Sequence, residues 1–409
     1  MNRETLLGKK FHLKKRKALW DAMKPDSLAL ICSAEIPADP YARVKHRNWP
    51  QNSEFYYLTG ISQPKCSLLL IKSKSYDRLE ILFIPAIDKH FIRWEGAMLK
   101  TTDASNLSGI EDIQYNHNLD TTLNNLLPKL THFYIATTAS TMDQGKSAYE
   151  LKIADIKKYF WGLKMMKIGD ILDKLRWVKE DCEIDNIKKA IAITAKGIKR
   201  VAKRIAAGIY EHQLVADLTY EYLNAGCLGH AFYPIVGAGI NSTVLHYASA
   251  ADKLVENDVL LIDTGAEWGG YAADVTRVFP VGKNFTNQAA DIYALNLTIQ
   301  KTILANLKIG QSFAKISQLA QEIQTKLLIE NKLIKSPIEA KECTIHNIGH
   351  PLGLDVHDPP LFDEPLVPGS VITIEPGLYF PIKKIGVRIE DDILFTAKGI
   401  VNLTKDIPK

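Results

Sequence analysis

The stretch VLLIDTGAEWGGYAADVTRVF, residues 259–279, places two aspartates in a strongly apolar context. Asp263 follows four aliphatic residues and Asp274 precedes Val-Thr, a pattern that predicts two β-strands joined by a turn. If the turn centres between Trp268 and Gly269, the two aspartates lie directly opposite each other, with Cβ atoms about 4.5–5.5 Å apart. Carboxylates so placed in an apolar sheet repel and raise each other's pKa unless a cation lies between them. The hairpin therefore predicts a cation site.

Two glutamates occupy similar positions later in the chain. Glu375 ends the apolar run at residues 371–374, and Glu390 follows the strand-like run GVRI. A buried, unpaired charge at either place costs several kcal/mol. Taken singly, an aspartate at a strand end is usually a turn or cap residue, and a glutamate in a strand usually faces solvent. Four such acids in one region weaken that ordinary explanation.

Three of the 11 histidines fall in the stretch TIHNIGHPLGLDVHDP, at positions 346, 350 and 357. The spacing of the first two would suit a zinc-protease helix, but that motif is His-Glu-x-x-His and no glutamate is present. Pro351 and Gly353 also interrupt a helix, so a loop or strand is predicted. A histidine in a loop is usually a surface residue, so the residues alone leave these three roles open.

Charge balance indicates what such a site holds. Four carboxylates and a neutral histidine are more ligands than one small cation uses, and one divalent ion leaves about two negative charges uncompensated. Two divalent ions with a hydroxide between them bring the sum close to zero. Oxygen-rich ligation favours Mn²⁺, with Co²⁺, Zn²⁺ or Fe²⁺ as alternatives. Two metals about 3.5–4 Å apart are the arrangement that activates a bridging water for hydrolysis.

The length of 409 residues predicts two domains, with a boundary near residue 172. In residues 1–172, strand-like runs alternate with amphipathic stretches, as in a small α/β domain. The runs are SLALICSA, SEFYYLTGI, CSLLLIKS, LEILFIPA and HFYIATT. Residues 173–409 combine the acid-bearing strands with three long helical patterns, at 183–208, 287–306 and 312–331.

Composition narrows the class of protein. No apolar run approaches the ~20 residues that span a bilayer, and the basic N-terminus lacks the apolar core of a secretory signal. Five scattered cysteines without a Cys-x-x-Cys pair fit a reducing compartment, so a cytoplasmic protein without membrane association is expected. The net charge is only +5, and no RNA-binding motif accompanies the basic run at residues 9–17. That run is interpreted as a solvated face, and no nucleic-acid partner is expected.

The acids and one of the histidines together resemble the signature of the pita-bread metallopeptidases, which include methionine aminopeptidase, aminopeptidase P and prolidase. The set is Asp263, Asp274, His350, Glu375 and Glu390. The motifs LLIDTGAEWGGYAADVTRVFPV, HNIGHPLGLDVHDP, ITIEPGLY and GVRIEDDILFT resemble the aminopeptidase P family most closely. QNSEFYYLTG and LRWVKEDCEI resemble its N-terminal half and linker. The resemblance implies a small N-terminal α/β domain and a C-terminal pita-bread α+β catalytic domain.

The resemblance also implies a role for each residue of the set. Asp263 would chelate one metal, and Asp274 and Glu390 would bridge both. His350 and Glu375 would complete the shell of the second metal. Glu375 would also take up a proton and return it as the amine leaves.

Other residues match positions around the metals of the family. His346 and His357 would hydrogen-bond the scissile carbonyl and stabilise the oxyanion. His246 matches another active-site histidine. Arg388 matches an arginine that pairs with the metal-bound acids and orients them.

The implied reaction is hydrolysis of the bond between an N-terminal residue and a following proline, with a metal-bridging hydroxide as nucleophile. This Xaa-Pro bond lacks an N–H group, so the site needs an apolar proline pocket. Tyr379 and Trp94 are candidates for that pocket, with simple packing as the alternative for each. In the family a tryptophan of the N-terminal domain can reach a neighbouring subunit's site, which implies a homo-oligomer, either a dimer or a tetramer.

Three other kinds of pita-bread protein are alternatives to an aminopeptidase P. A prolidase, which cuts only Xaa-Pro dipeptides, has the same metal centre. A pita-bread protein without metals can act as a binding module, but such proteins usually lack several ligand residues that are all present here. Methionine aminopeptidases lack the N-terminal domain. Pro351 stands where relatives often carry a larger residue, a difference that affects the loop and not the ligand.

Overall fold

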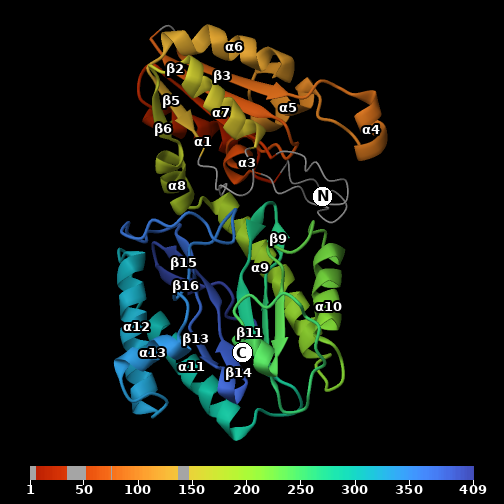
Figure 1. Cartoon of the computed structure of the whole chain (residues 1–409), viewed down its shortest axis with the longest axis vertical. Coiled ribbons are helices and arrows are strands. Elements are labelled where there is room, and N and C mark those ends of the chain that lie inside the picture. The colour runs from red at the N-terminus through yellow and green to blue at the C-terminus, as the bar shows by residue number, and fades with distance from the viewer. Residues whose placement is uncertain (1–5, 35–51, 75, 137–146) are drawn as a thin grey trace. The chain divides into compact units, whose positions relative to one another are not determined.

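The computed structural model describes residues 6–34, 52–74, 76–136 and 147–409. The chain divides into an N-terminal unit, Asn2–Leu175, and a C-terminal unit that begins at Arg176. Helix α8, Gly169–Trp177, contains both this division and the predicted boundary near residue 172. Each unit has its own apolar core, so the two units, whose elements are labelled in Figure 1, are described separately.

The N-terminal unit is built on a six-stranded sheet in the order β4-β3-β2-β1-β5-β6. The strands are β1 (Ser27–Cys32), β2 (Ser67–Ser73), β3 (Tyr76–Ile84), β4 (Asp112–Tyr115), β5 (His132–Ile135) and β6 (Lys164–Lys167). β1, β2 and β3 pair antiparallel, whereas β4, β5 and β6 join in parallel. The helices are α1 (Lys9–Ala22), α3 (Ser53–Thr59), α4 (Lys89–Glu95), α5 (Thr101–Ser108), α6 (Leu119–Leu126) and α7 (Ala148–Tyr159). The mixed α/β fold predicted for this half is confirmed.

The predicted strand SEFYYLTGI is helix α3 instead. Asn52 caps the helix by accepting a hydrogen bond from the backbone N–H of Phe55, and Gly60 ends it in the left-handed conformation, with φ of 70°. Residues 55–59 are all buried, so the apolar run carries no helical period that would distinguish it from a buried strand. The two cap residues, Asn52 and Gly60, were the only local indication of a helix.

The C-terminal unit encloses short antiparallel sheets between long helices (Figure 1). Its strands are β7 (Ile235–Ala238), β8 (Val259–Thr264), β9 (Glu267–Trp268), β10 (Tyr271–Ala272), β11 (Val275–Pro280), β12 (Val371–Ile374), β13 (Gly377–Phe380), β14 (Ile385–Arg388), β15 (Asp391–Thr396) and β16 (Gly399–Asn402). Buried side chains of α9 (Asp181–Ala202) and α10 (Glu211–Asn224) pack on β7 and β8. Those of α11 (Asn287–Asn306) and α12 (Phe313–Glu330) pack on β12–β15, beside the short helix α13 (Ala340–Cys343).

The three predicted long helices are present. α11 has the predicted bounds, and α12 differs from its predicted bounds by one residue at each end. Thr286 and Ser312 cap these two helices through their hydroxyl groups. α9 ends at Ala202 rather than at residue 208, because the backbone N–H groups of Lys203 and Arg204 close it with tighter i→i−3 hydrogen bonds.

The hairpin of β8 and β11 differs in register from the prediction. Asp263 lies opposite Thr276, not opposite Asp274. Gly269 and Gly270 have positive φ angles of 62° and 86°, the conformation of a type I′ turn, which moves the centre of the turn one residue along the chain. Asp274 comes two residues before Thr276, so it is a diagonal neighbour of Asp263 rather than its direct partner.

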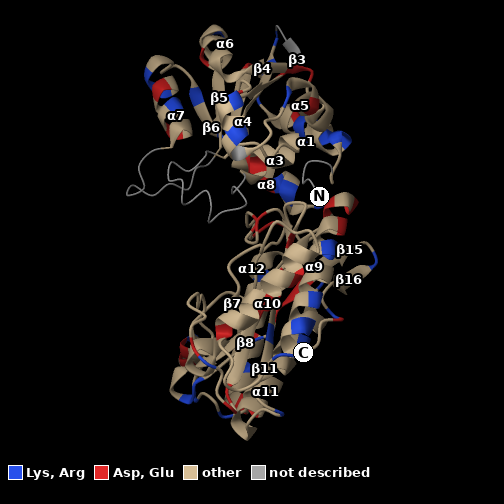
Figure 2. Cartoon of the chain, turned by 90° about the vertical axis from the view of Figure 1, so that its right-hand side faces the viewer, with Lys and Arg blue, Asp and Glu red and all other residues tan. Residues whose placement is uncertain are grey.

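The surface carries charges of both signs. On the face shown in Figure 2, Lys and Arg are interspersed with Asp and Glu in each unit. Among the helices of the described ranges, none combines the length and the apolar character that crossing a bilayer requires.

Candidate metal centre

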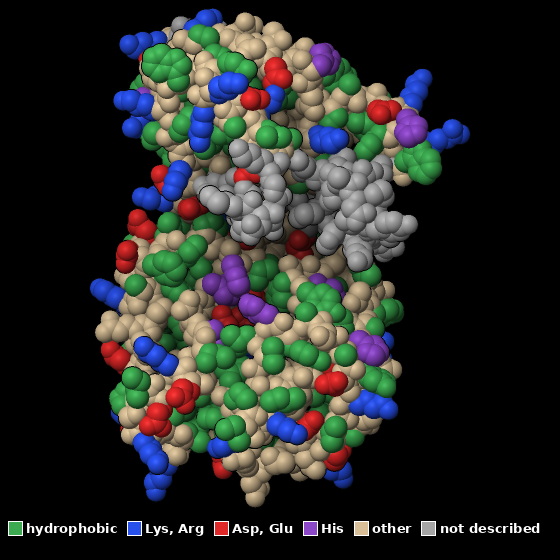
Figure 3. Space-filling view, in the orientation of Figure 1, with side chains coloured by type: hydrophobic (Ala, Val, Ile, Leu, Met, Phe, Trp, Pro, Cys, Tyr) green, Lys and Arg blue, Asp and Glu red, His purple; other side chains and the backbone are tan. Residues whose placement is uncertain are grey.

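The predicted ligands meet at one cavity of about 810 Å³ in the C-terminal unit. Figure 3 shows this hollow, with histidines and acids gathered in it. The five predicted ligands all line it: Asp263, Asp274, His350, Glu375 and Glu390. So do four residues predicted to lie around the metals: His246, His346, His357 and Arg388.

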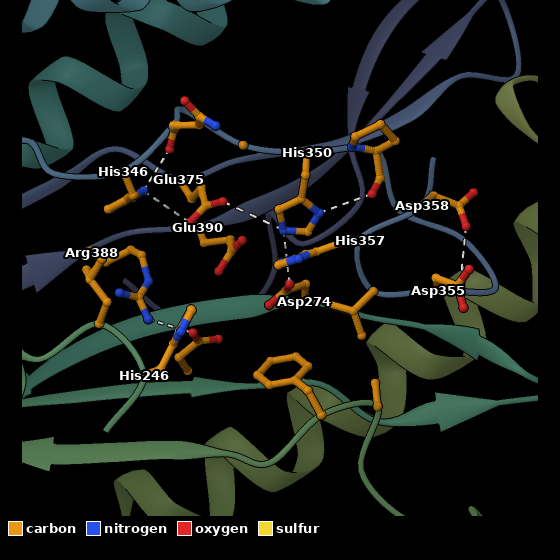
Figure 4. A pocket seen from close by; sticks show the side chains of 18 of the residues that line it. His246, Asp274, His346, His350, Asp355, His357, Asp358, Glu375, Arg388 and Glu390 are labelled. Carbon is orange, nitrogen blue, oxygen red and sulfur yellow. Dashed lines mark hydrogen bonds and ion pairs between the residues drawn. The ribbon is translucent and has the colours of Figure 1, made fainter. Parts of the chain in front are cut away.

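Asp274, His350 and Glu390 form the tightest group of donors. One donor atom of each lies within 4.8 Å of the donor atoms of the other two. His350 Nε2 is 3.4 Å from Asp274 Oδ2 and 3.7 Å from Glu375 Oε1 (Figure 4). Residues far apart in the sequence thus present nitrogen and oxygen donors to one point, as a divalent-cation site requires.

The loop that carries His350 runs against β12 and fixes the imidazole. The backbone N–H of His350 donates to Thr373 Oγ1 at 3.0 Å, and its carbonyl accepts from the Thr373 N–H at 2.8 Å. Gly349 makes this approach feasible, since a Cβ there would lie 2.1 Å from the Thr373 carbonyl oxygen. His350 Nδ1 lies 3.1 Å from the carbonyl oxygen of Pro351, which can only accept. Nδ1 therefore carries the proton, and the lone pair of Nε2 faces the acids.

Two amides of α11 position both glutamates, and sequence reasoning missed them. Gln300 Nε2 donates to the carbonyl oxygens of the residues just before Glu375 and Glu390, at 3.3 and 2.9 Å. Asn296 Nδ2 donates to the carbonyl oxygen of the residue just after Glu375, at 2.9 Å. Both amide side chains are fully buried, which is unusual for their type unless they are hydrogen-bonded.

The acids of the centre outnumber the compensating positive charges. Burial, followed by repulsion from neighbouring carboxylates, raises the pKa of Asp274 and Glu375 well above the ordinary range and that of Glu390 to about 7. Asp392, which the sequence did not single out, is buried nearby, and burial and the Glu390 charge raise its pKa as well. One carboxylate oxygen each of Asp263 and Asp274 is buried without a hydrogen-bond partner in the described part of the chain. Orphaned oxygens and unbalanced charge fit bound cations.

Arg388 is the guanidinium of the site, and its nitrogens are engaged. Its Nη2 donates to Asp263 Oδ2 at 2.5 Å, and its Nη1 donates to the Tyr379 hydroxyl at 2.8 Å. Its Nε donates to Thr276 Oγ1 at 3.1 Å, and that hydroxyl donates to Glu390 Oε2 at 2.7 Å. One cation cannot neutralise four carboxylates, so Arg388 orients acids and leaves charge for metal ions.

The three histidines of the cavity other than His350 differ in whether their ring nitrogens already form hydrogen bonds. His346 Nδ1 contacts the carbonyl oxygen of Asn347 at 2.7 Å, and its Nε2 contacts the Tyr379 hydroxyl at 2.9 Å. Both nitrogens are thus occupied, which differs from the predicted contact of His346 with a substrate carbonyl. Among the described residues, no hydrogen bond engages the rings of His246 or His357. These two are the histidines whose ring nitrogens can face a substrate.

Tyr379 does not line the cavity as predicted. Its side chain is 1% exposed, and burial raises the pKa of its hydroxyl to about 12. The hydroxyl accepts from Arg388 and donates to His346, so it joins two site residues rather than forming a wall. Trp94 lies on α4 of the N-terminal unit, 73% exposed, with its indole N–H 3.1 Å from His90 Nε2. Its predicted substrate contact stays a prediction.

Apolar residues that the sequence did not single out form much of the cavity wall. They are Phe232, Tyr233, Leu245, Phe313, Val356 and Phe362. No local motif marks them, because they come from separate loops and helices that only the fold brings together.

A buried charge cluster anchors the loop that carries His357. Asp358 Oδ1 accepts from Arg176 Nη2 at 2.5 Å, and its Oδ2 pairs with Lys179 Nζ at 3.0 Å. All three side chains are almost completely buried. Burial alone would raise the pKa of Asp358, but the charges of Arg176 and Lys179 lower it below its usual value.

We expect Asp358→Asn to lower the free energy of unfolding by about 3–5 kcal/mol at neutral pH, because buried Lys179 loses its charged partner and buried Arg176 keeps only Asp355. Since the pKa is lowered on folding, the stabilisation is present above the unfolded pKa of about 4 and is lost as the pH falls through the folded value. Urea unfolding of wild type and variant from about pH 3 to 7 measures this. Exposed Asp185, paired with Lys188, gives the matched control Asp185→Asn, expected to change stability by less than about 0.5 kcal/mol. Equal effects of the two variants would contradict the anchoring role.

The comparisons with known proteins agree with this geometry. The pattern of metallopeptidase family M24 matches residues 185–397, and that of the aminopeptidase P N-terminal domain matches residues 12–134. The Xaa-Pro aminopeptidase of Escherichia coli K12 is 30% identical over 97% of this chain and 94% of its own length. A Bacillus anthracis structure provisionally assigned as an aminopeptidase P is 31% identical, with a TM-score of 0.92 over 98% of this chain and 96% of the other. E. coli aminopeptidase P with the inhibitor Pro-Leu gives a TM-score of 0.86 at 30% identity over the same shares.

The chain therefore belongs to metallopeptidase family M24, with the pita-bread fold. Its two units are those of aminopeptidase P, an N-terminal domain followed by the M24 domain, as the sequence motifs predicted. It is a hydrolase, a metal-dependent aminopeptidase that uses divalent ions.

Proposed function

We propose that this aminopeptidase cleaves the bond between an N-terminal residue and a following proline, using two divalent metal ions. The observation that carries the proposal is the cluster of uncompensated acids at the base of a cavity with an apolar wall. The acids require cations, and the apolar wall suits a proline ring, which has no N–H to satisfy. Relatives named Xaa-Pro aminopeptidase support the same substrate.

The ligand assignment follows the donors present. Asp263 would bind one ion, Asp274 and Glu390 would bridge, and His350 with Glu375 would complete the second site. Mn²⁺ is proposed because four of the five ligands supply carboxylate oxygen, with Co²⁺, Zn²⁺ or Fe²⁺ as alternatives. When bound, the pair supplies a hydroxide nucleophile at neutral pH and a Lewis acid for the carbonyl oxygen.

The protein's own groups handle the proton and the oxyanion. Glu375 takes a proton from the nucleophile and delivers it to the proline nitrogen as that nitrogen leaves. The free rings of His246 and His357 donate hydrogen bonds to the developing oxyanion. Arg388 holds Asp263 and, through Thr276, orients Glu390.

We infer a preference for longer peptides over Xaa-Pro dipeptides. In a dipeptide, a carboxylate follows the proline directly, and a site built for it needs a cation. Arg388 is the one Lys or Arg among the described residues that line the cavity, and it is already hydrogen-bonded by Asp263 and Tyr379. We therefore prefer an aminopeptidase that acts on longer peptides to a prolidase.

A substrate panel tests the function. We expect an Xaa-Pro-Yaa tripeptide to be cut with kcat/KM at least ~10-fold higher than the Xaa-Pro dipeptide, and an Xaa-Ala-Yaa control to be cut poorly, because a missing pocket contact costs ~1–3 kcal/mol. The assay is run with added Mn²⁺ and with chelator. A preference for the dipeptide would show a prolidase, and equal cleavage of the alanine peptide would refute proline specificity.

Three further expectations stay predictions: a homo-oligomer, either dimer or tetramer; a contact of Trp94 with a neighbouring subunit's substrate; and a cytoplasmic location. Mass photometry and turnover of a Trp94→Ala variant would test the first two.

A further inference from the structure

Glu211 is a fully buried acid that the reaction described above does not use. It is the first residue of α10, and in the described part of the chain no Lys or Arg pairs with it. Burying an ionised carboxylate without a cation is costly unless hydrogen-bond donors surround it. The partners of Glu211 therefore indicate what the residue does.

Four hydrogen-bond donors, all from the segment 238–252, point at this carboxylate. Oε1 accepts from the backbone N–H of Ala238 at 2.8 Å and from Asn241 Nδ2 at 3.1 Å. Oε2 accepts from the Tyr247 hydroxyl at 2.8 Å and from the backbone N–H of Asp252 at 3.0 Å. A carboxylate is the group that can accept at every one of these positions, because an amide or a hydroxyl would place a donor against a donor.

These donors all belong to the segment 238–252, which we call the His246 loop. Asn241 also donates to the Tyr247 hydroxyl at 3.0 Å, and the Ala251 N–H donates to the same hydroxyl at 3.3 Å. Ala250 has a φ of 44°, a conformation that residues with a Cβ rarely adopt, and its carbonyl accepts from the His212 N–H at 2.9 Å. The loop is thus held in a conformation it would not adopt unaided.

The other side of the His246 loop faces the metal centre. Leu245, His246 and Ala248 line the cavity, whereas Tyr247 turns its hydroxyl to Glu211. Figure 4 shows His246 pointing into the same space as Arg388 and Asp274. The ring of His246 has no hydrogen bond of its own in the described residues, so its position depends on the backbone that carries it.

The loop is clamped from a second direction. Ser242 Oγ accepts from the backbone N–H of Gly386 at 2.8 Å, and a Cβ at residue 386 would lie 2.0 Å from the Ser242 carbonyl oxygen. Gly386 belongs to β14, the strand that carries Arg388. The His246 loop is therefore fixed by contacts with both β14 and Glu211. We expect the loss of either contact to let His246 shift.

We propose that Glu211 is a positioning residue that holds His246 against the substrate through Tyr247. The inference rests on the proposed function, because it assigns His246 to the oxyanion of that reaction. The proposal makes a specific prediction: a change at Glu211 alters kcat through the position of His246 and does not alter the binding of the metal ions.

A double-mutant cycle tests this inference in the full-length, Mn²⁺-loaded enzyme. We expect Glu211→Gln to lower kcat for the tripeptide by about 10–100-fold with little change in KM, since a shift of about 1 Å in a catalytic group has that effect. His246→Ala is expected to cost about 10²–10³-fold in kcat. In the His246→Ala background, Glu211→Gln should change kcat by no more than about twofold, because the group it positions is gone.

Two companion variants keep the test decisive. Tyr247→Phe removes only the hydroxyl that links the loop to Glu211, so it should lower kcat in the same direction and replaces Glu211→Gln in the cycle if that variant does not fold. Asp217→Asn is the matched control: Asp217 is a buried acid of the same helix, paired with Arg200 and Arg204 away from the loop. It should lower the melting temperature but leave kcat within about twofold of wild type.

The outcomes separate the two hypotheses. Unchanged kcat in Tyr247→Phe and Glu211→Gln, full additivity with His246→Ala, or loss of metal from Glu211→Gln would overturn the positioning role while the wild type still cleaves the tripeptide. A wild type that does not cleave the tripeptide would overturn the proposed function and this inference with it.

Discussion

Glu375→Gln is expected to lower kcat for an Xaa-Pro-Yaa peptide by about 10²–10⁴-fold, the usual worth of a general acid–base group. The substitution keeps the shape and one oxygen of the side chain but removes the group that can carry a proton to the proline nitrogen. Because glutamine does not alter the apolar wall, KM should change far less than kcat. Steady-state kinetics at saturating Mn²⁺ measures both constants.

Two controls separate proton transfer from folding and from metal loss. Glu322→Gln, on the exposed face of α12, makes the same chemical change away from the cavity and should leave kcat unaltered. Because Glu375 is also a proposed ligand, the metal content of Glu375→Gln is measured directly, and kcat is compared only for protein loaded to the wild-type metal content. Turnover near the wild-type rate in a metal-loaded Glu375→Gln protein would refute the proton-shuttle role.

Removing the metal ions is expected to lower kcat/KM by at least ~10³-fold, since several kcal/mol of transition-state stabilisation come from them. Dialysis against a chelator, followed by back-titration with Mn²⁺, should restore the activity. Mg²⁺ serves as the control ion, because it gives up its bound water reluctantly. Full activity after verified removal would contradict a metal-dependent reaction.

Metal removal also has an expected pH signature in stability. Burial and neighbouring acids raise the pKa of Glu390 to about 7 and that of Asp274 well above its usual value. For a pKa raised on folding, the stabilisation is present below the unfolded pKa of about 4 and is lost as the pH rises through the folded value. The metal-free protein should therefore lose melting temperature between about pH 5 and 8, whereas the Mn²⁺-loaded protein should not.

The candidate ligands could be chosen from the sequence because their signal is chemical and local; the structure brings them to one cavity, and their roles as ligands stay predictions. Each acid interrupts an apolar run, and the set of five appears in order along the chain, so Asp263, Glu375 and the others could be chosen without coordinates. The register of the hairpin was wrong because it depends on which residues adopt positive φ. A turn at Gly269 and Gly270 and one centred between Trp268 and Gly269 are equally compatible with the apolar pattern.

The residues that the sequence missed act through the fold. Gln300 and Asn296 lie on a helix whose pattern marks them only as polar, and Glu211 lies more than 150 residues before the glutamate ligands. Their hydrogen-bond partners, backbone groups for Gln300 and Asn296 and both backbone and side-chain donors for Glu211, lie in other segments, which no periodicity reveals. Helix α3 was missed for a different reason: complete burial removes the polar face that distinguishes a helix from a buried strand.

The measurement that tests the central claim most directly is the number of divalent ions bound per chain. Purified protein is stripped, titrated with Mn²⁺ by calorimetry at neutral pH, desalted and analysed for metal, with Asp274→Asn as the comparison. The clustered acids predict two ions per wild-type chain, protons released as they bind, and fewer than two in the variant. A wild-type chain that turns over substrate fully with one ion or none would contradict the account.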